Sequence, residues 1–133
     1  MFKRKTAVSD YVIKLFKKND SPLSVNQIIE ALNQRSLFPN KSTVYRIIDK
    51  LKEHQFICEV PLKYGPTYFE LNHNIHHHHH FFCNQCEKLF CLESCNFDFK
   101  NLISSQFLKQ NISFKIESHD FNLYGVCDVC QKE

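Results

Sequence analysis

The feature that most constrains this chain is a pair of Cys-x-x-Cys motifs placed far apart in the sequence. Five consecutive histidines (positions 76–80) run through two phenylalanines into Cys83 and Cys86, and the second pair, Cys127 and Cys130, lies close to the last residue. Two such pairs brought together supply four thiolates, which is the ligand set of a structural zinc ion. The segment between the pairs must then fold so that the end of the chain returns to the strand that follows the histidines.

A four-thiolate zinc site is closed, because no coordination position remains for a substrate. The sequence therefore predicts that these cysteines stabilise the fold. The competing interpretation is a redox-active pair, but no βαβ pattern accompanies the two motifs.

The histidine run is the second candidate for metal chemistry. A purification tag or a flexible metal-scavenging tract is the alternative, but this run is internal and is flanked by apolar residues typical of a strand. On a strand, side chains alternate between faces, so one segment can serve two separate metal sites. One face would carry His76, His78 and His80, and the other would carry His77 and His79.

Each histidine set needs further ligands, and imidazole with carboxylate suits zinc, iron or manganese, whereas an added thiolate favours zinc. For every carboxylate in the candidate set, an ordinary solvent-exposed position is the alternative. The candidates are Glu70, Cys91, Glu93, Asp98, Glu117 and His119.

Charge divides the chain into two unlike parts. Residues 1–55 carry eleven Lys/Arg against five Asp/Glu, whereas the rest carries six against nine together with all seven cysteines and seven of the eight histidines. This division indicates a polyanion-binding domain followed by a metal-binding domain, with a chance asymmetry of solvated lysines as the alternative.

The start of the chain, residues 1–5, lacks the apolar core of a secretory signal, and no stretch is long and apolar enough to span a membrane. We therefore expect a cytoplasmic protein without a membrane partner.

Apolar periodicity predicts three helices in the first part. The first covers about 9–18, the second follows Ser24 as N-cap with Gln27 at the capping-box position, and the third begins near Ser42. Strands at 56–60 and 67–71 follow, joined by a turn at 61–66. Three helices followed by a hairpin is the order of a winged helix, a helix-turn-helix variant.

The outer surface of the third predicted helix carries side chains suited to base edges and phosphates. For Tyr45, an ordinary half-buried position is the alternative. The candidates are Lys41, Ser42, Thr43, Tyr45 and Arg46.

Beyond a hinge at 72–74, strands at 88–92, 113–118 and 121–124 surround a predicted helix at 99–110. The sequence thus predicts an α+β protein with a winged-helix DNA-binding domain at 1–72 and a small α/β metal-binding domain at 73–133. The second domain would bury little apolar area by itself, which argues for metal stapling, dimerisation or both.

Three motifs resemble the ferric uptake regulator (Fur) family over nearly the whole chain. Residues 42–48 resemble its A-T-V-Y-R recognition helix, and residues 76–86 resemble its H-H-x-H-x-x-C-x-x-C segment. Residues 119–127 resemble its H-x-L-x-L-Y-G-x-C ending, with Phe121 replacing the first leucine. The resemblance implies a homodimeric, metal-activated repressor that is not an enzyme and binds a palindromic double-stranded DNA operator, with a tetramer as the alternative assembly.

The resemblance also implies site residues. A structural zinc ion would bind Cys83, Cys86, Cys127 and Cys130. An exchangeable regulatory metal would bind Glu70, His78, His80 and Cys91, and a second would bind His77, His79, Asp98 and His119. Tyr45 would contact a base and Arg46 a phosphate, while Lys3, Arg4 and Lys5 are DNA contacts by charge alone.

The chain departs from the family pattern in ways that bear on the metal. His79 stands where the family commonly has aspartate, Cys91 where it usually has an acid, and the usual first-domain histidine aligns near Pro22. The helix that usually precedes the first one here is nearly absent, so the N-terminal arm is shortened. These softer ligands favour a zinc sensor over a sensor of iron, manganese or peroxide. A metal-storage or delivery protein is a rival interpretation, and a hydrolytic zinc enzyme lacks an H-E-x-x-H motif.

Overall fold

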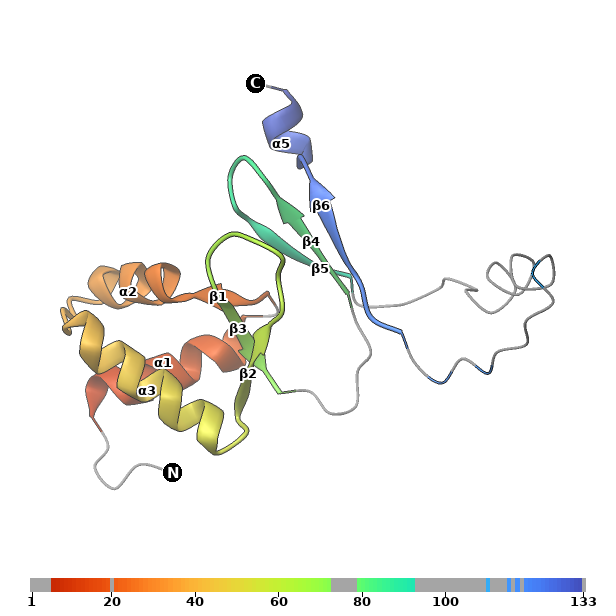
Figure 1. Cartoon of the computed structure of the whole chain (residues 1–133). Coiled ribbons are helices and arrows are strands. Elements are labelled where there is room, and N and C mark those ends of the chain that lie inside the picture. Colours follow the sequence, from red (N-terminus) through yellow and green to blue (C-terminus); the bar gives the residue numbers. More distant parts are fainter. Residues whose placement is uncertain are drawn as a thin grey trace.

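A computed structural model describes residues 6–19, 21–72, 79–92, 110, 115, 117 and 119–132. The first part of the chain contains three helices and the three strands of a first sheet. The second part contains the three strands of a second sheet and a one-turn helix (Figure 1). The elements are α1 (Ala7–Lys18), β1 (Leu23–Ser24), α2 (Val25–Gln34), α3 (Lys41–Glu53), β2 (Ile57–Val60), β3 (Tyr68–Leu71), β4 (His79–Cys83), β5 (Leu89–Leu92), β6 (Asn122–Gly125) and α5 (Asp128–Gln131).

The three predicted helices are confirmed. Helix α2 begins with the predicted capping box, in which the Ser24 hydroxyl accepts from the Gln27 N–H at 3.2 Å and the Gln27 side chain accepts from the Ser24 N–H at 2.9 Å. Helix α3 begins one residue earlier than expected, at Lys41 after the N-cap Asn40. Its expected apolar stripe is buried in the core: Val44, Ile47, Ile48 and Leu51.

The predicted hairpin is also confirmed, as antiparallel strands β2 and β3. The short strand β1, which periodicity did not predict, adds to the free edge of β3 and gives the sheet order β1-β3-β2. Two residues are too few to produce a pattern, so β1 exists because β3 offers it unpaired backbone groups.

Strand β4 lies at the centre of the second described sheet, antiparallel to β5 and parallel to β6. The predicted strands at 88–92 and 121–124 are thereby confirmed to within one residue. The predicted helix at 99–110 and strand at 113–118 fall almost wholly outside the described residues.

The first sheet packs on two sides, because side chains alternate along its strands. Its Ile57 and Phe69 join the core formed with the helices, whereas Val60 and Tyr68 join a second apolar cluster with Phe82 of β4 and Leu89 of β5. The second sheet therefore lies against the face of the first sheet that the helices leave open (Figure 1).

The turn between β2 and β3, residues 61–67, packs closely against the second sheet. Gly65 has a φ of +93°, and a Cβ built there would lie 2.6 Å from the Cζ atom of Phe82. Backbone and side-chain hydrogen bonds cross the same contact: the Lys63 N–H donates to the Tyr124 hydroxyl at 2.8 Å, and Asn122 Nδ2 donates to the Pro61 carbonyl at 3.0 Å. The wing thus rests on the metal-binding half of the chain.

Candidate metal centres and nucleic-acid interface

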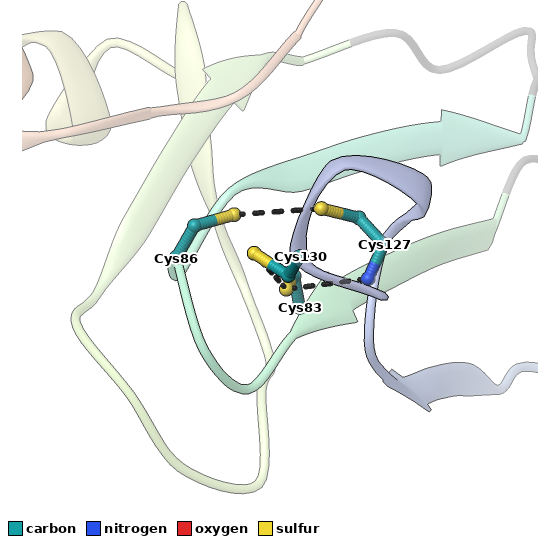
Figure 2. A group of neighbouring side chains, drawn as sticks. All are labelled: Cys83, Cys86, Cys127 and Cys130. Carbon is teal, nitrogen blue, oxygen red and sulfur yellow. Dashed lines mark hydrogen bonds between the residues drawn. The ribbon is translucent and has the colours of Figure 1, made fainter. Parts of the chain in front are cut away.

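The four cysteines of the predicted structural site come together beside the end of β4 (Figure 2). Cys83 ends β4, Cys86 lies in the turn that follows, Cys127 is the N-cap of α5, and Cys130 lies within that helix. All four Sγ atoms lie within 4.8 Å of one another. Cys83 Sγ is 3.8 Å from Cys130 Sγ, and Cys86 Sγ is 3.8 Å from Cys127 Sγ.

These distances fit a tetrahedral metal site. A zinc–sulfur bond of about 2.3 Å places the sulfurs of a regular tetrahedron about 3.8 Å apart. A disulfide would require about 2.05 Å. The donor set and its spacing therefore suit one tetrahedral thiolate-bound ion.

The parallel pairing of β4 and β6 creates the cage. Cys83 is the register partner of Gly125, so the chain leaves β6 beside the end of β4 and reaches Cys127 two residues later. The Cys127 N–H donates to Cys83 Sγ at 3.4 Å. The single turn of α5 then places Cys130 on the same side as Cys127, because residues three apart are neighbours on a helix.

The thiols of the cage differ in acidity. The backbone N–H groups of Cys86 and Cys127 lower the pKa of Cys83 to about 6, since they stabilise its thiolate. The neighbouring Cys127 side chain and burial raise the pKa of Cys130 to about 12. At neutral pH the lowered pKa of Cys83 favours its thiolate, whereas the raised pKa of Cys130 favours its thiol, which must lose a proton when a metal binds.

The predicted regulatory site is divided between the two sheets. Glu70 Oε2 of β3 lies 3.1 Å from His80 Nε2 of β4, and both side chains are largely buried. Cys91 of β5 is the register partner of His80. The fourth predicted ligand, His78, lies outside the described residues.

The second predicted regulatory site lies on the opposite face of β4. The ring of His79 stacks on Phe121 at a centroid distance of 3.7 Å and on His119 at 5.3 Å. Nδ1 of His79 lies 3.1 Å from the Phe121 carbonyl oxygen, which fixes the orientation of this buried ring. His77 and Asp98 lie outside the described residues.

Cys58 of β2 was not assigned to any site from the sequence. It is the register partner of Glu70, and burial, followed by the charge of Glu70, raises the pKa of its thiol. The sequence offered a signal for this pairing. Residues equally far from the middle of a hairpin turn face each other across its strands, and positions 58 and 70 are each six residues from Tyr64.

The predicted nucleic-acid contacts lie on the first half of α3. Lys41, Ser42, Tyr45 and Arg46 are exposed, and Thr43 is half-buried. The Tyr45 side chain retains 48% of its accessible surface. Lys41 and Tyr45 also line a cavity of about 390 Å³ whose other side is the wing. Lys3, Arg4 and Lys5 lie outside the described residues.

A three-helix unit with a β-hairpin wing, followed by a sheet that carries a thiolate cage, defines a winged-helix protein with a metal-binding domain. The model of the ferric uptake regulator family matches residues 3–124. The chain belongs to this family of metal-responsive transcription regulators, which bind DNA and form dimers and are not enzymes.

Curated relatives agree with this assignment, and a solved structure shares the fold. The chain is 28% identical over 123 residues to the ferric uptake regulation protein of Bordetella parapertussis, covering 91% of this chain and 84% of that one. It is 31% identical over 111 residues to the peroxide-responsive repressor PerR of Staphylococcus aureus, covering 81% and 69%. The Francisella tularensis ferric uptake regulator with iron has a TM-score of 0.70 at 24% identity, covering 98% and 97%.

The family, the fold class and the expectation of a non-enzymatic regulator are thereby confirmed. Among the described helices, none is both long and apolar enough to cross a membrane.

Proposed function

We propose that this protein is a metal-dependent repressor that binds a palindromic double-stranded DNA operator as a homodimer and controls metal-uptake genes in the cytoplasm, with zinc as the favoured regulatory metal. The observation that carries the proposal is the 3.1 Å approach of Glu70 to His80. It joins a wing strand of the DNA-binding half to the central strand of the metal-binding half.

This contact offers a means of switching. A divalent cation bound there would attract the carboxylate and the imidazole together. The orientation in which the two sheets are in contact would gain stability relative to any orientation in which they are apart. Such a differential affinity is what a ligand needs to shift a conformational equilibrium.

The ligand chemistry supports zinc in two roles. Four thiolates at Cys83, Cys86, Cys127 and Cys130 would hold a structural zinc ion. Cys91 beside His80, and His79 in place of an acid, make the exchangeable sites softer than a carboxylate-rich set. Iron, manganese and peroxide are the alternative signals, and the names of the Bordetella and Staphylococcus relatives point to iron and peroxide.

The exposed start of α3 would contact the operator. Tyr45 is proposed to contact a base edge and Arg46 a phosphate, with Ser42 and Lys41 nearby. Both α3 helices of a dimer would then enter successive major grooves of a palindrome.

The outer face of the second sheet is suited to the second copy of the chain. It presents an apolar hollow of about 340 Å³. Leu123 there is 42% exposed. Burying such a surface favours association, and a tetramer is the alternative assembly. The lining side chains include Phe81, Phe90, Leu92, Leu123 and Val126.

The proposal can be tested on DNA sites selected from a randomised duplex library with the zinc-loaded protein. Zinc, iron(II) and manganese(II) are then titrated into protein stripped at the exchangeable sites, and DNA affinity is followed by fluorescence anisotropy. We expect tightened binding with at least one metal, zinc first. Equal affinity with and without every metal would contradict the proposal.

The Tyr45→Ala/Arg46→Ala variant separates repression from metal storage or delivery. It should lose DNA binding but keep its metal content. Lys132→Ala removes an exposed charge at the C-cap of α5 and should bind DNA normally. A double variant whose DNA binding is unchanged would favour the storage or delivery function.

A further inference from the structure

Cys58 lies on the face of the first sheet that meets the second sheet. It pairs directly with Glu70 across β2 and β3, and directly opposed residues of an antiparallel pair share a face. The adjacent Ile57 points into the helix-side core, as alternation requires. Cys58 is half-buried and carries a free thiol.

The apolar part of the contact between the sheets shows which residue pairs of the two sheets lie opposite each other. Val60 pairs with Tyr68 in the first sheet, and Phe82 pairs with Leu89 in the second. All four side chains meet in one buried cluster. The two cross-strand pairs therefore face each other.

Two residues further along each strand, the same faces carry metal-binding groups in place of apolar ones. Because the side-chain period of a strand is two, the pair Cys58–Glu70 lies beside Val60–Tyr68. By the same rule, the pair His80–Cys91 lies beside Phe82–Leu89. The 3.1 Å approach of Glu70 to His80 shows that these second pairs also face each other.

The topology thus places two thiols, one carboxylate and one imidazole on the facing sides of two sheets. Among the described residues, only the four cysteines of the cage have three or more ligand atoms within 4.8 Å of one another, so a metal would have to draw the inter-sheet side chains closer together. We propose that Cys58 is a zinc ligand at this inter-sheet site, so that it and Cys91 supply two thiolates beside Glu70 and His80. This inference deepens the proposed function and rests on it for the regulatory role of the site. Two thiolates favour zinc over iron(II) and manganese(II), which prefer nitrogen and oxygen donors.

Cys58 belongs to the wing, and this gives the ligand a consequence for DNA binding. Glu70 and Cys58 come from the winged-helix half, while His80 and Cys91 come from the metal-binding half. A metal held by two ligands from each half would stabilise the contact between the halves. Loss of Cys58 would leave a single wing ligand among these four residues.

Cobalt(II) provides the test, because its bonds to thiolate give a charge-transfer band in the near ultraviolet. Full-length protein that retains zinc at the four-cysteine cage is titrated with cobalt(II), and zinc retention is checked by elemental analysis. We expect Cys58→Ser and Cys91→Ser each to lose roughly half of the band and the double variant to lose it, since each cobalt–sulfur bond contributes similarly.

Two further variants distinguish coordination from packing. Glu59→Gln changes the neighbouring exposed residue, whose side chain pairs with Lys52 at 2.6 Å, and should leave the spectrum unchanged. Cys58→Asp restores a ligand atom and should recover cobalt affinity relative to Cys58→Ser without recovering the band. A full band and unchanged affinity in Cys58→Ser would overturn the inference.

The same samples separate this inference from the proposed function. If wild-type DNA affinity responds to metal while Cys58→Ser keeps the full band and the wild-type response, the inference is wrong and the proposed function stands. If wild-type DNA affinity ignores every metal, the proposed function is wrong, and the cobalt band still decides whether Cys58 is a ligand.

Discussion

The two groups of metal-binding side chains differ in how their ligands are distributed over the fold. The cage of four cysteines is built at one end of a single sheet, with paired sulfurs at 3.8 Å. The inter-sheet group, represented by Glu70 and His80, joins two sheets that belong to different halves of the chain. A metal bound within one unit stabilises only that unit. A metal bound between two units stabilises the state in which they are in contact over the state in which they are separated.

The largest effect that this comparison predicts is the loss of the cage. Cys127→Ser should release the structural zinc and unfold the second half, because structural zinc contributes apparent binding free energies of about 10–16 kcal/mol in small domains. Zinc content and circular dichroism would show it. Val129→Ala is the matched control, since Val129 lies in the same turn but is 61% exposed. A folded, zinc-free Cys127→Ser protein would contradict the structural role.

The pH dependence of metal affinity should also separate the two groups. Cys130, whose pKa is raised to about 12, must lose its proton when zinc binds, so affinity at the cage should fall as pH falls, by about tenfold per pH unit for each proton displaced. In the inter-sheet group Glu70 displaces no proton near neutral pH, and only Cys58 and Cys91 are thiols, against four thiols at the cage. The inter-sheet group should therefore show a shallower slope. Chelator competition between about pH 8 and about pH 6 measures both slopes, and identical slopes would remove the distinction.

Removal of one inter-sheet ligand should abolish the response without unfolding the protein. Glu70→Gln keeps the size of the side chain but loses the charge, and we expect more than about tenfold weaker metal binding, because even outer-shell partners of a metal contribute that much. Metal-dependent DNA anisotropy is the measurement, and Glu59→Gln is the control on the neighbouring strand. A variant that responds like the wild type would show that Glu70 does not bind the regulatory metal.

The smallest expected effect concerns the link between the wing and the cage turn. The Tyr68 hydroxyl donates a hydrogen bond to the Glu87 carbonyl, one residue after Cys86. Tyr68→Phe keeps the ring in the buried cluster and should cost about 0.5–1.5 kcal/mol in the free energy of unfolding. Thermal or urea unfolding measures it. An unchanged stability would mean that this hydrogen bond contributes nothing to the contact between the sheets.

Much of the first half followed from the sequence because its signals are local. The capping box at Ser24 and the apolar stripe of α3 each lie within one helix, so periodicity and side-chain chemistry predicted them. Strand β1 did not follow, since its two residues have no period and need β3 as a partner. The spacing of the cysteines likewise identified a thiolate cage, but not the parallel β4–β6 pairing that assembles it.

The division of the histidine run into two faces was predictable for the same reason. Alternation sends His79 and His80 to opposite sides of β4, and the structure places one beside Phe121 and the other beside Glu70. What each face would meet was not predictable from alternation. That depended on how the two sheets pack.

The sequence by itself determined the ligand types, the helix-turn-helix order and the family, because these depend on residue identity and short-range spacing. Only the tertiary structure decided that the open face of the first sheet meets β4 and β5. Cys58 and Glu70, which the hairpin register already places on one face, therefore lie opposite His80 and Cys91. The physical reason is that two sheets pack through their buried apolar side chains. The packing of these apolar side chains also determines which polar side chains, two residues further along the same strands, lie opposite each other.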